Sequence, residues 1–184
     1  MRRTFIFSVI TISILLSGCL GEAENSNADK KIEGFHAYAT DEFKLQIPDE
    51  WEVLTPVNFK SDTPKNTLVA FRNNIRNEKF TSNVAIIKNE LTADISTLDY
   101  AKNLLQKVKN EIFEFKEVQV SDHADGLFIY FEGKEVPTGD LKRFVQVAGV
   151  KGKTAYIAIG AFLTSDSEDT AKKIEEMIKS FEVK

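Results

Sequence analysis

Two stretches of the sequence are apolar at nearly every position: LFIYF, residues 127–131, and AYIAIGAFL, residues 155–163. A strand with one solvated face alternates apolar and polar residues, whereas a strand buried on both faces is a continuous apolar run. Both stretches are therefore expected to be central strands, with residues 127–131 and 156–162 inaccessible to solvent on both sides. The sheet that contains them must be covered on its two faces.

Other segments fit the flanks of such a sheet. FKLQIP, residues 43–48, alternates apolar and polar side chains and ends at a proline, which cannot donate to a ladder. Trp51, just beyond it, is expected to fold back into the core. Strands are expected over residues 43–48, 67–72, 83–90, 114–120, 125–133, 141–150 and 154–163.

Two further segments have the period of an amphipathic helix. In residues 96–112 the apolar side chains step by three and four positions, and Ser96 with Asp99 has the form of a capping box. Residues 165–183 carry a second apolar stripe of the same period. The stripes comprise Leu98, Ala101, Leu105, Val108 and Ile112 in the first helix, and Ile174, Met177, Ile178 and Phe181 in the second.

These elements predict an α+β fold. The expected architecture is a three-layer α/β/α sandwich, with a mainly antiparallel sheet of about six to seven strands and two main helices, one on each face. The alternative is a two-layer fold with both helices on one face. Residues 38–184 fit one domain of a size that buries a substantial core without disulfides.

The start of the chain has the order of a secretory signal peptide. Two arginines precede the apolar run 5–16, which as a helix would measure about 18 Å, too short for a hydrocarbon core of about 30 Å. The segment LSGC, residues 16–19, resembles the lipobox of prokaryotic lipoproteins. That resemblance implies cleavage between Gly18 and Cys19 and a diacylglyceryl group on Cys19, the only cysteine in the chain. An ordinary signal peptide that leaves a free thiol is the alternative.

The segment after the cysteine is polar and lacks periodicity, so residues 19–37 are interpreted as the lipidated cysteine and a flexible tether. A docked extension near Ile32 and Phe35 is the alternative. Removing residues 1–18 would change the net charge from −4 to −6, because two arginines are lost. An acidic chain without a basic cluster does not suggest nucleic-acid binding. A monomer is expected.

Several segments of the domain resemble the PsbP-like family in order and spacing. FKLQIPDEW resembles its opening F-x-l-x-x-P-x-x-W, SNVAIIKNE its NV-x-V strand, ADGLFIYFEG its G-x-x-Y-Y-x-x-E segment, and MIKSFEV its closing helix end. The resemblance covers about residues 43–183 and implies an α/β/α sandwich. Photosynthetic members are accessory proteins of photosystem II, and other relatives are prokaryotic lipoproteins. No ion-ligand motif of the family is present to transfer.

One turn carries a possible metal site. SDHADG, residues 121–126, places Asp122, His123 and Asp125 together, and imidazole and carboxylates are common metal ligands. The alternative is a turn between two strands, since Asp and Gly favour turns. Glu132 and Glu135 could act as paired carboxylates, or simply be solvated at a strand end.

Fourteen phenylalanines are many for this length, and three near element ends could line a surface cleft: Phe59, Phe80 and Phe162. Core packing is the alternative. No G-x-S-x-G, P-loop or G-x-G-x-x-G motif occurs, and no cofactor is expected. We therefore expect a membrane-anchored extracytoplasmic lipoprotein, non-enzymatic, that binds a membrane protein complex or a small ligand. The alternatives are a weak metal-dependent hydrolase or ion-binding protein using the 122–125 turn, and a structural envelope protein.

Overall fold

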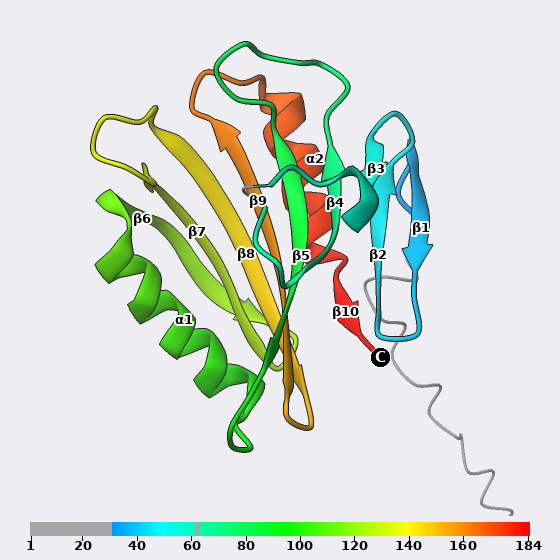
Figure 1. The fold of residues 1–184 in the computed structure, drawn as a ribbon, viewed down its shortest axis with the longest axis vertical. Helices are drawn as coiled ribbons and strands as arrows, with labels where there is room; N and C mark the ends of the chain where they lie inside the picture. Colours follow the sequence, from blue (N-terminus) through cyan, green and yellow to red (C-terminus); the bar gives the residue numbers. More distant parts are fainter. Residues whose placement is uncertain (1–30, 62) are drawn as a thin grey trace, which may run out of the picture.

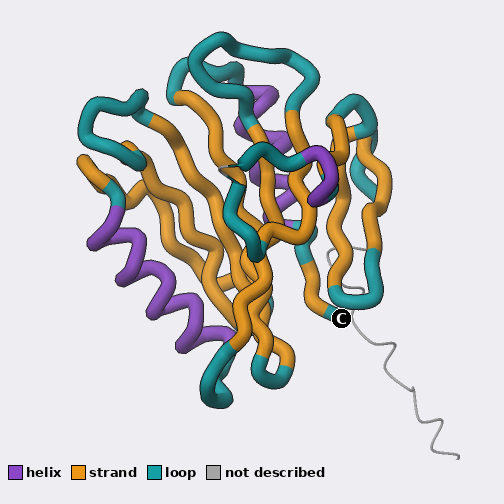
Figure 2. Tube along the Cα trace, viewed as in Figure 1, coloured by secondary structure: helices purple, strands orange, loops and turns teal. Residues whose placement is uncertain are grey.

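The computed structural model describes residues 31–61 and 63–184. The predicted signal peptide and the lipidation site, Gly18 and Cys19, lie outside these residues. In chain order the elements are β1 (Phe35–Ala39), β2 (Phe43–Pro48), β3 (Glu52–Leu54), a 3-10 turn η2 (Pro56–Asn58), β4 (Thr67–Arg72), β5 (Asn83–Glu90), α1 (Thr97–Glu111), β6 (Phe113–His123), β7 (Gly126–Lys134), β8 (Lys142–Lys151), β9 (Thr154–Leu163), α2 (Glu168–Lys179) and β10 (Glu182–Val183). Figures 1 and 2 show their arrangement.

The strands form two sheets. The larger has seven antiparallel strands in the order β3-β4-β5-β9-β8-β7-β6, and the smaller has the order β1-β2-β10. Every expected strand is present, and the predicted α+β fold with two helices and a mainly antiparallel sheet is confirmed. The short strands β1, β3 and β10 were not predicted, because two to five residues leave too little periodicity to recognise.

The two helices cover opposite faces of the seven-stranded sheet (Figure 1). Side chains alternate along a strand, so neighbours such as Phe128 and Ile129 belong to different faces. Phe128 packs in the cluster that contains the α2 side chains, whereas Ile129 packs in the cluster that contains the α1 side chains. The three-layer arrangement is therefore correct, and the two-layer alternative is wrong.

The small sheet lies on the same side as α2. Its strand β2 contacts α2, and the aromatic side chains of Phe35 and Phe43 are buried in the α2 cluster. Ile32 also packs against this cluster. The predicted boundary at residue 38 is therefore wrong: the folded chain includes β1 and the segment before it, because these apolar side chains dock on the core.

Capping side chains fix where the helices begin. The Ser96 hydroxyl accepts a hydrogen bond from the Asp99 backbone N–H at 3.1 Å, as its position predicts. Ser167 does the same for Thr170 at 3.2 Å at the start of α2. No helix in the described ranges is long and apolar enough to cross a membrane.

The two continuous apolar stretches are not buried everywhere. Residues such as Tyr156, Ala158 and Phe162 on the α2 side are buried, whereas Ile159 and Ala161 on the other side are partly exposed. The reason is that α1 contacts β6, β7 and β8 but leaves the β9-β5-β4 part of the same face uncovered. This uncovered part forms a groove, described below.

Candidate functional site

The predicted metal-binding segment is a tight hairpin turn. Strand β6 ends at His123 and β7 begins at Gly126, opposite it in register, so only Ala124 and Asp125 form the connection. Ala124 has a positive φ of 48°. The segment is therefore a turn between two strands, which is the alternative predicted for it from the sequence.

Strand geometry separates the three proposed ligands. His123 and Ser121 point to one face of β6, while Asp122 between them points to the other, and Asp125 lies in the turn. In the part of the chain that the structure describes, no three His, Cys, Asp or Glu side chains group in a way that could hold a metal ion. The metal site at Asp122, His123 and Asp125 has no support in this geometry.

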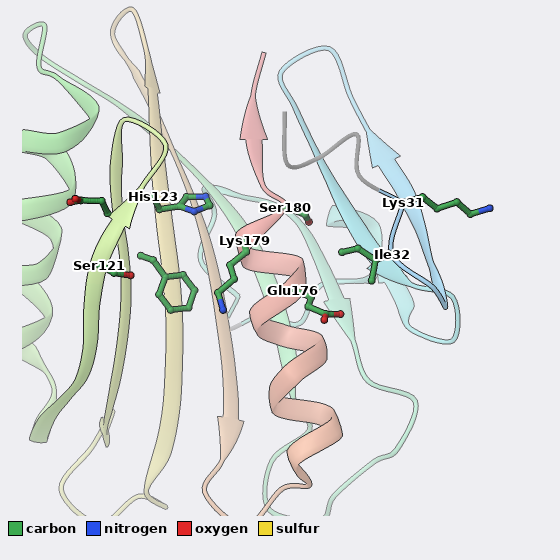
Figure 3. A pocket seen from close by; sticks show the side chains of 9 residues that line it. Lys31, Ile32, Ser121, His123, Glu176, Lys179 and Ser180 are labelled. Carbon is green, nitrogen blue, oxygen red and sulfur yellow. The ribbon is translucent and has the colours of Figure 1, made fainter. Parts of the chain in front are cut away.

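His123 instead borders a cavity of about 480 Å³ between the β6–β7 hairpin, the end of α2 and the N-terminal segment, here called the His123 cavity. Figure 3 shows His123 and Lys179 directed into this space, with Ile32 facing α2 from the opposite side. The lining residues are Lys31, Ile32, Ser121, Asp122, His123, Phe128, Glu176, Lys179 and Ser180.

The surroundings of His123 favour its neutral form. Burial, and then the nearby Lys179 ammonium, lower the pKa of His123, and the Asp125 carboxylate opposes them only in part. Lys179 is held in place by Glu175 at 3.0 Å and lies 4.9 Å from the centre of the Phe128 ring. A cation approaching His123 would be repelled by this ammonium.

We expect Lys179→Gln to raise the pKa of His123, because one positive neighbour is removed. The folded-state pKa lies below the ordinary value of 6.5, so the unfolded chain takes up the proton first as the pH falls through 6.5, and stability is lost there. The variant should lose less stability on acidification. An NMR titration of the imidazole protons, assigned with His36→Gln, measures the pKa.

Lys172→Gln on the same helix is the matched control and should leave the His123 titration unchanged. An unchanged His123 pKa in Lys179→Gln would contradict the electrostatic explanation.

Ser180, at the far wall of the cavity, has a structural role. Its buried hydroxyl accepts a hydrogen bond from the Gln46 backbone N–H at 2.8 Å and donates one to the Met177 carbonyl oxygen at 2.8 Å. These bonds connect β2 of the small sheet to the end of α2.

Ser180→Ala should therefore lower the free energy of unfolding by about 1–3 kcal/mol, because a buried backbone N–H loses its partner. Urea denaturation followed by circular dichroism measures the loss. Ser165→Ala, at an exposed position, is expected to stay within about 0.5 kcal/mol of the wild type. Equal stabilities of the two variants would refute the role of Ser180.

The paired carboxylates are ion-paired rather than poised for catalysis. Glu132 lies 3.0 Å from the Arg143 guanidinium and 3.4 Å from the Lys116 ammonium, and its hydrogen bond with Arg143 is the main cause of a lowered pKa. Glu135 forms an ion pair with Lys142. A general acid needs a raised pKa, so Glu132 is unsuited to that role.

The uncovered part of the sheet forms a second hollow of about 440 Å³, here called the open groove. Its floor comprises small side chains on three neighbouring strands: Ala70 of β4 lies opposite Ala85 of β5, and Ala161 lies on β9. Ile159 and Phe144 continue the floor toward α1. Ala161 lies diagonal to Ala85, because Ile159 is the residue opposite Ala85 on β9, so these small side chains leave a diagonal depression in an apolar surface.

The walls come from loops. The segment between β3 and β4, which crosses in front of these strands in Figure 1, supplies Phe59, and the β4–β5 loop supplies Phe80. The Lys142 ammonium lies 4.0 Å from the centre of the Phe80 ring and fixes that wall. The prediction of a phenylalanine-lined cleft is correct for Phe59 and Phe80 and wrong for Phe162, which is buried in the α2 cluster.

Charged side chains lie at the edge of the open groove. Arg72 lines it and donates from Nε and Nη2 to the same Glu52 oxygen at 3.2 and 2.6 Å. Lys60 lines it and is exposed, and Glu135 is neutralised by Lys142. Sequence reasoning missed Arg72 and Lys60, because nothing local shows that they border a common hollow.

The fold can be compared with known proteins. No model of a protein family matches the chain, and no curated protein has a similar sequence. Solved structures do share the fold. The solution structure of cyanobacterial PsbP (CyanoP) from Synechocystis sp. PCC 6803 is 15% identical, with a TM-score of 0.50, and the match covers 91% of this chain and 100% of that one.

Two other solved structures are similar. LpqN of Mycobacterium tuberculosis, described as involved in cell envelope biogenesis, is 15% identical with a TM-score of 0.56, over 77% of this chain and 82% of that one. A point mutant of the protein Mog1 is 11% identical with a TM-score of 0.54, over 81% and 95%. At such identities the likeness concerns the fold. The chain thus has the α+β sandwich fold of PsbP and LpqN, as its sequence resemblance implied.

Proposed function

We propose that this protein is a lipid-anchored extracytoplasmic accessory protein whose PsbP-like domain is a non-enzymatic binding module. The observation that carries the proposal is the open groove: a concave, apolar and partly exposed area at the centre of the seven-stranded sheet. Concave apolar sites of about 300–1,000 Å³ with a few polar groups at the edge are typical of ligand-binding sites.

The polar groups elsewhere in the domain fit a binding role better than a catalytic one. Glu132 is held by Arg143, Ser180 joins two elements of the core, and His123 is kept neutral beside an ammonium. The contacts of Glu132 and Ser180 stabilise the fold and engage groups that a catalyst would need to be free. The description of LpqN as a protein involved in cell envelope biogenesis is consistent with a place in the envelope.

The membrane anchor is the second part of the proposal. A diacylglyceryl group on Cys19 supplies two chains, which is what stable anchoring requires. The structure describes the chain from residue 31, and any eleven-residue segment, such as residues 20–30, can span at most about 40 Å. The domain would therefore work close to the outer side of the membrane, within reach of an envelope protein complex, without contacting nucleic acid.

A pull-down from native membranes tests the proposal. Wild-type lipoprotein should retain a stoichiometric partner or an apolar small molecule, and Ala85→Phe, which fills the floor of the open groove, should lose it. Cys19→Ala, without the anchor, should lose a membrane-complex partner. Ala93→Phe, at an exposed loop position, is the control for the bulk of the new side chain. Retention of the same partner by Ala85→Phe would refute a role for the groove.

A further inference from the structure

We infer that the open groove binds a single-chain amphiphile with an anionic head group, such as a fatty-acid carboxylate, with its chain along the alanine floor and its head at Arg72 and Lys60. The inference rests on the proposed binding function and adds the ligand class. It follows from the shape of the floor, the walls and the distribution of charge.

The floor favours an unbranched chain. Ala70 and Ala85 lie opposite each other on β4 and β5. Ala161 lies on β9 two residues beyond Ile159, the residue opposite Ala85, so the three methyl groups mark a shallow track that crosses the sheet diagonally. The rings of Phe59 and Phe80 lie at its sides. Ile159, opposite Ala85, borders the track on β9, and Phe144 of β8, opposite Ala161, closes it toward α1. A polymethylene chain fits a narrow apolar track and gains free energy for each methylene that it removes from water.

The charge at the edge favours an anionic head. Glu135, which lines the groove, is paired with Lys142, and Glu52 is paired with the groove residue Arg72. The Nη1 amino group of Arg72 makes no hydrogen bond to any described residue, and Lys60 has no ion pair within the described ranges. Donors thus remain available for a carboxylate, while no free carboxylate among the described groove residues remains for a cation.

The protein itself is acidic, with a formal net charge of −4, so its overall field does not attract anions. Binding of an anion would therefore be local, produced by charge-assisted hydrogen bonds at the edge of the groove. Such bonds discriminate between head groups that share one chain length. This gives the inference a direct test.

The test uses the mature chain, residues 19–184, with Cys19→Ala, which carries no lipid and needs no detergent. Titration calorimetry compares a medium-chain fatty acid, the alcohol and the amine of the same chain length, below their aggregation concentrations. We expect the carboxylate to bind at least about tenfold more tightly than the alcohol or the amine, as one or two charge-assisted hydrogen bonds imply.

Variants separate the chain from the head. Ala85→Phe should weaken the binding of all three probes by at least about tenfold, because the new ring fills the floor of the groove. Two variants test the head group: Lys60→Gln, and the double variant Arg72→Gln with Glu52→Gln, in which no carboxylate is left unpaired. Each should weaken binding of the fatty-acid carboxylate and leave binding of the alcohol unchanged. Lys65→Gln is the matched control, since it lies in the same segment but does not line the groove.

If carboxylate and alcohol bind equally and Ala85→Phe blocks both, the inferred preference for an anionic head group is overturned. The groove would then still be a binding site. Binding of no probe would overturn the amphiphile entirely. In that case a partner lost from the membrane pull-down with Ala85→Phe would still support the proposed function, so the two failures are distinguishable.

Discussion

Phe43→Ala is expected to lower the free energy of unfolding by about 3–5 kcal/mol, the range for removing a fully buried phenylalanine. Only 1% of Phe43 is exposed. Its ring lies 6.2 Å from the ring of Tyr38 and 5.9 Å from the ring of Phe181, so it joins β1 and the end of α2. The small sheet would lose the side chain that holds it on the core.

Urea denaturation measured by tryptophan fluorescence suits this variant, because Trp51 is buried in the same cluster and is the only tryptophan. Val57→Ala is the control for truncation of an apolar side chain: 89% of that residue is exposed, and the change should stay within about 0.5 kcal/mol. A loss below about 1 kcal/mol for Phe43→Ala would show that the small sheet contributes little to stability.

Ile174→Ala is expected to cost about 2–5 kcal/mol, because this α2 side chain is fully buried against the sheet. It lies directly over Gly160 of β9, where an added Cβ would come within 2.3 Å of the Ile174 Cγ2 methyl. Gly160→Ala alone should therefore cost about 1–3 kcal/mol through overpacking. The glycine lets the helix approach the sheet closely.

The two changes together test that close contact. In the double variant the new methyl occupies part of the space left by the isoleucine, so its loss of stability should be smaller than the sum of the single losses by about 0.5–3 kcal/mol. Thermal and urea unfolding of the wild type, the two single variants and the double variant measures the four stabilities of this double-mutant cycle. Strictly additive losses would mean that Ile174 and Gly160 do not share a packing contact.

The coverage of the sheet links these stability effects to the groove. On one face of the seven-stranded sheet, α2 and the small sheet cover the strands, so substitutions there change the stability of the fold. On the other face, α1 covers only the β6-β7-β8 half. Ala85 lies outside that cover and is only partly buried, so Ala85→Phe should change binding far more than stability.

Much of the fold could be predicted from local pattern. Alternation gave FKLQIP as a strand, the continuous apolar runs gave the central strands, and the 3-and-4 spacing gave both helices, because backbone geometry imposes these periods on any chain. The interpretation of the chain as tether up to residue 37 was wrong, since Ile32 and Phe35 are too few apolar residues to reveal that they dock on the α2 cluster.

The candidate site was predicted less well. Asp122, His123 and Asp125 are close in sequence, yet a strand turns successive side chains to opposite faces, so closeness in sequence did not bring them together. The cleft suggested by Phe59 and Phe80 was correct: both residues lie in segments that connect strands, and they line the open groove.

The sequence by itself determined the layers of this protein: two amphipathic helices and a central sheet with strands that are apolar on both faces. It did so because hydrophobic periodicity records how each element meets the core. Only the tertiary structure decided that α1 covers half of one face and that Arg72, Lys60 and Ala85 border one groove. Those relations depend on the angle and position of α1 and on pairings between strands far apart in the chain, which no local pattern encodes.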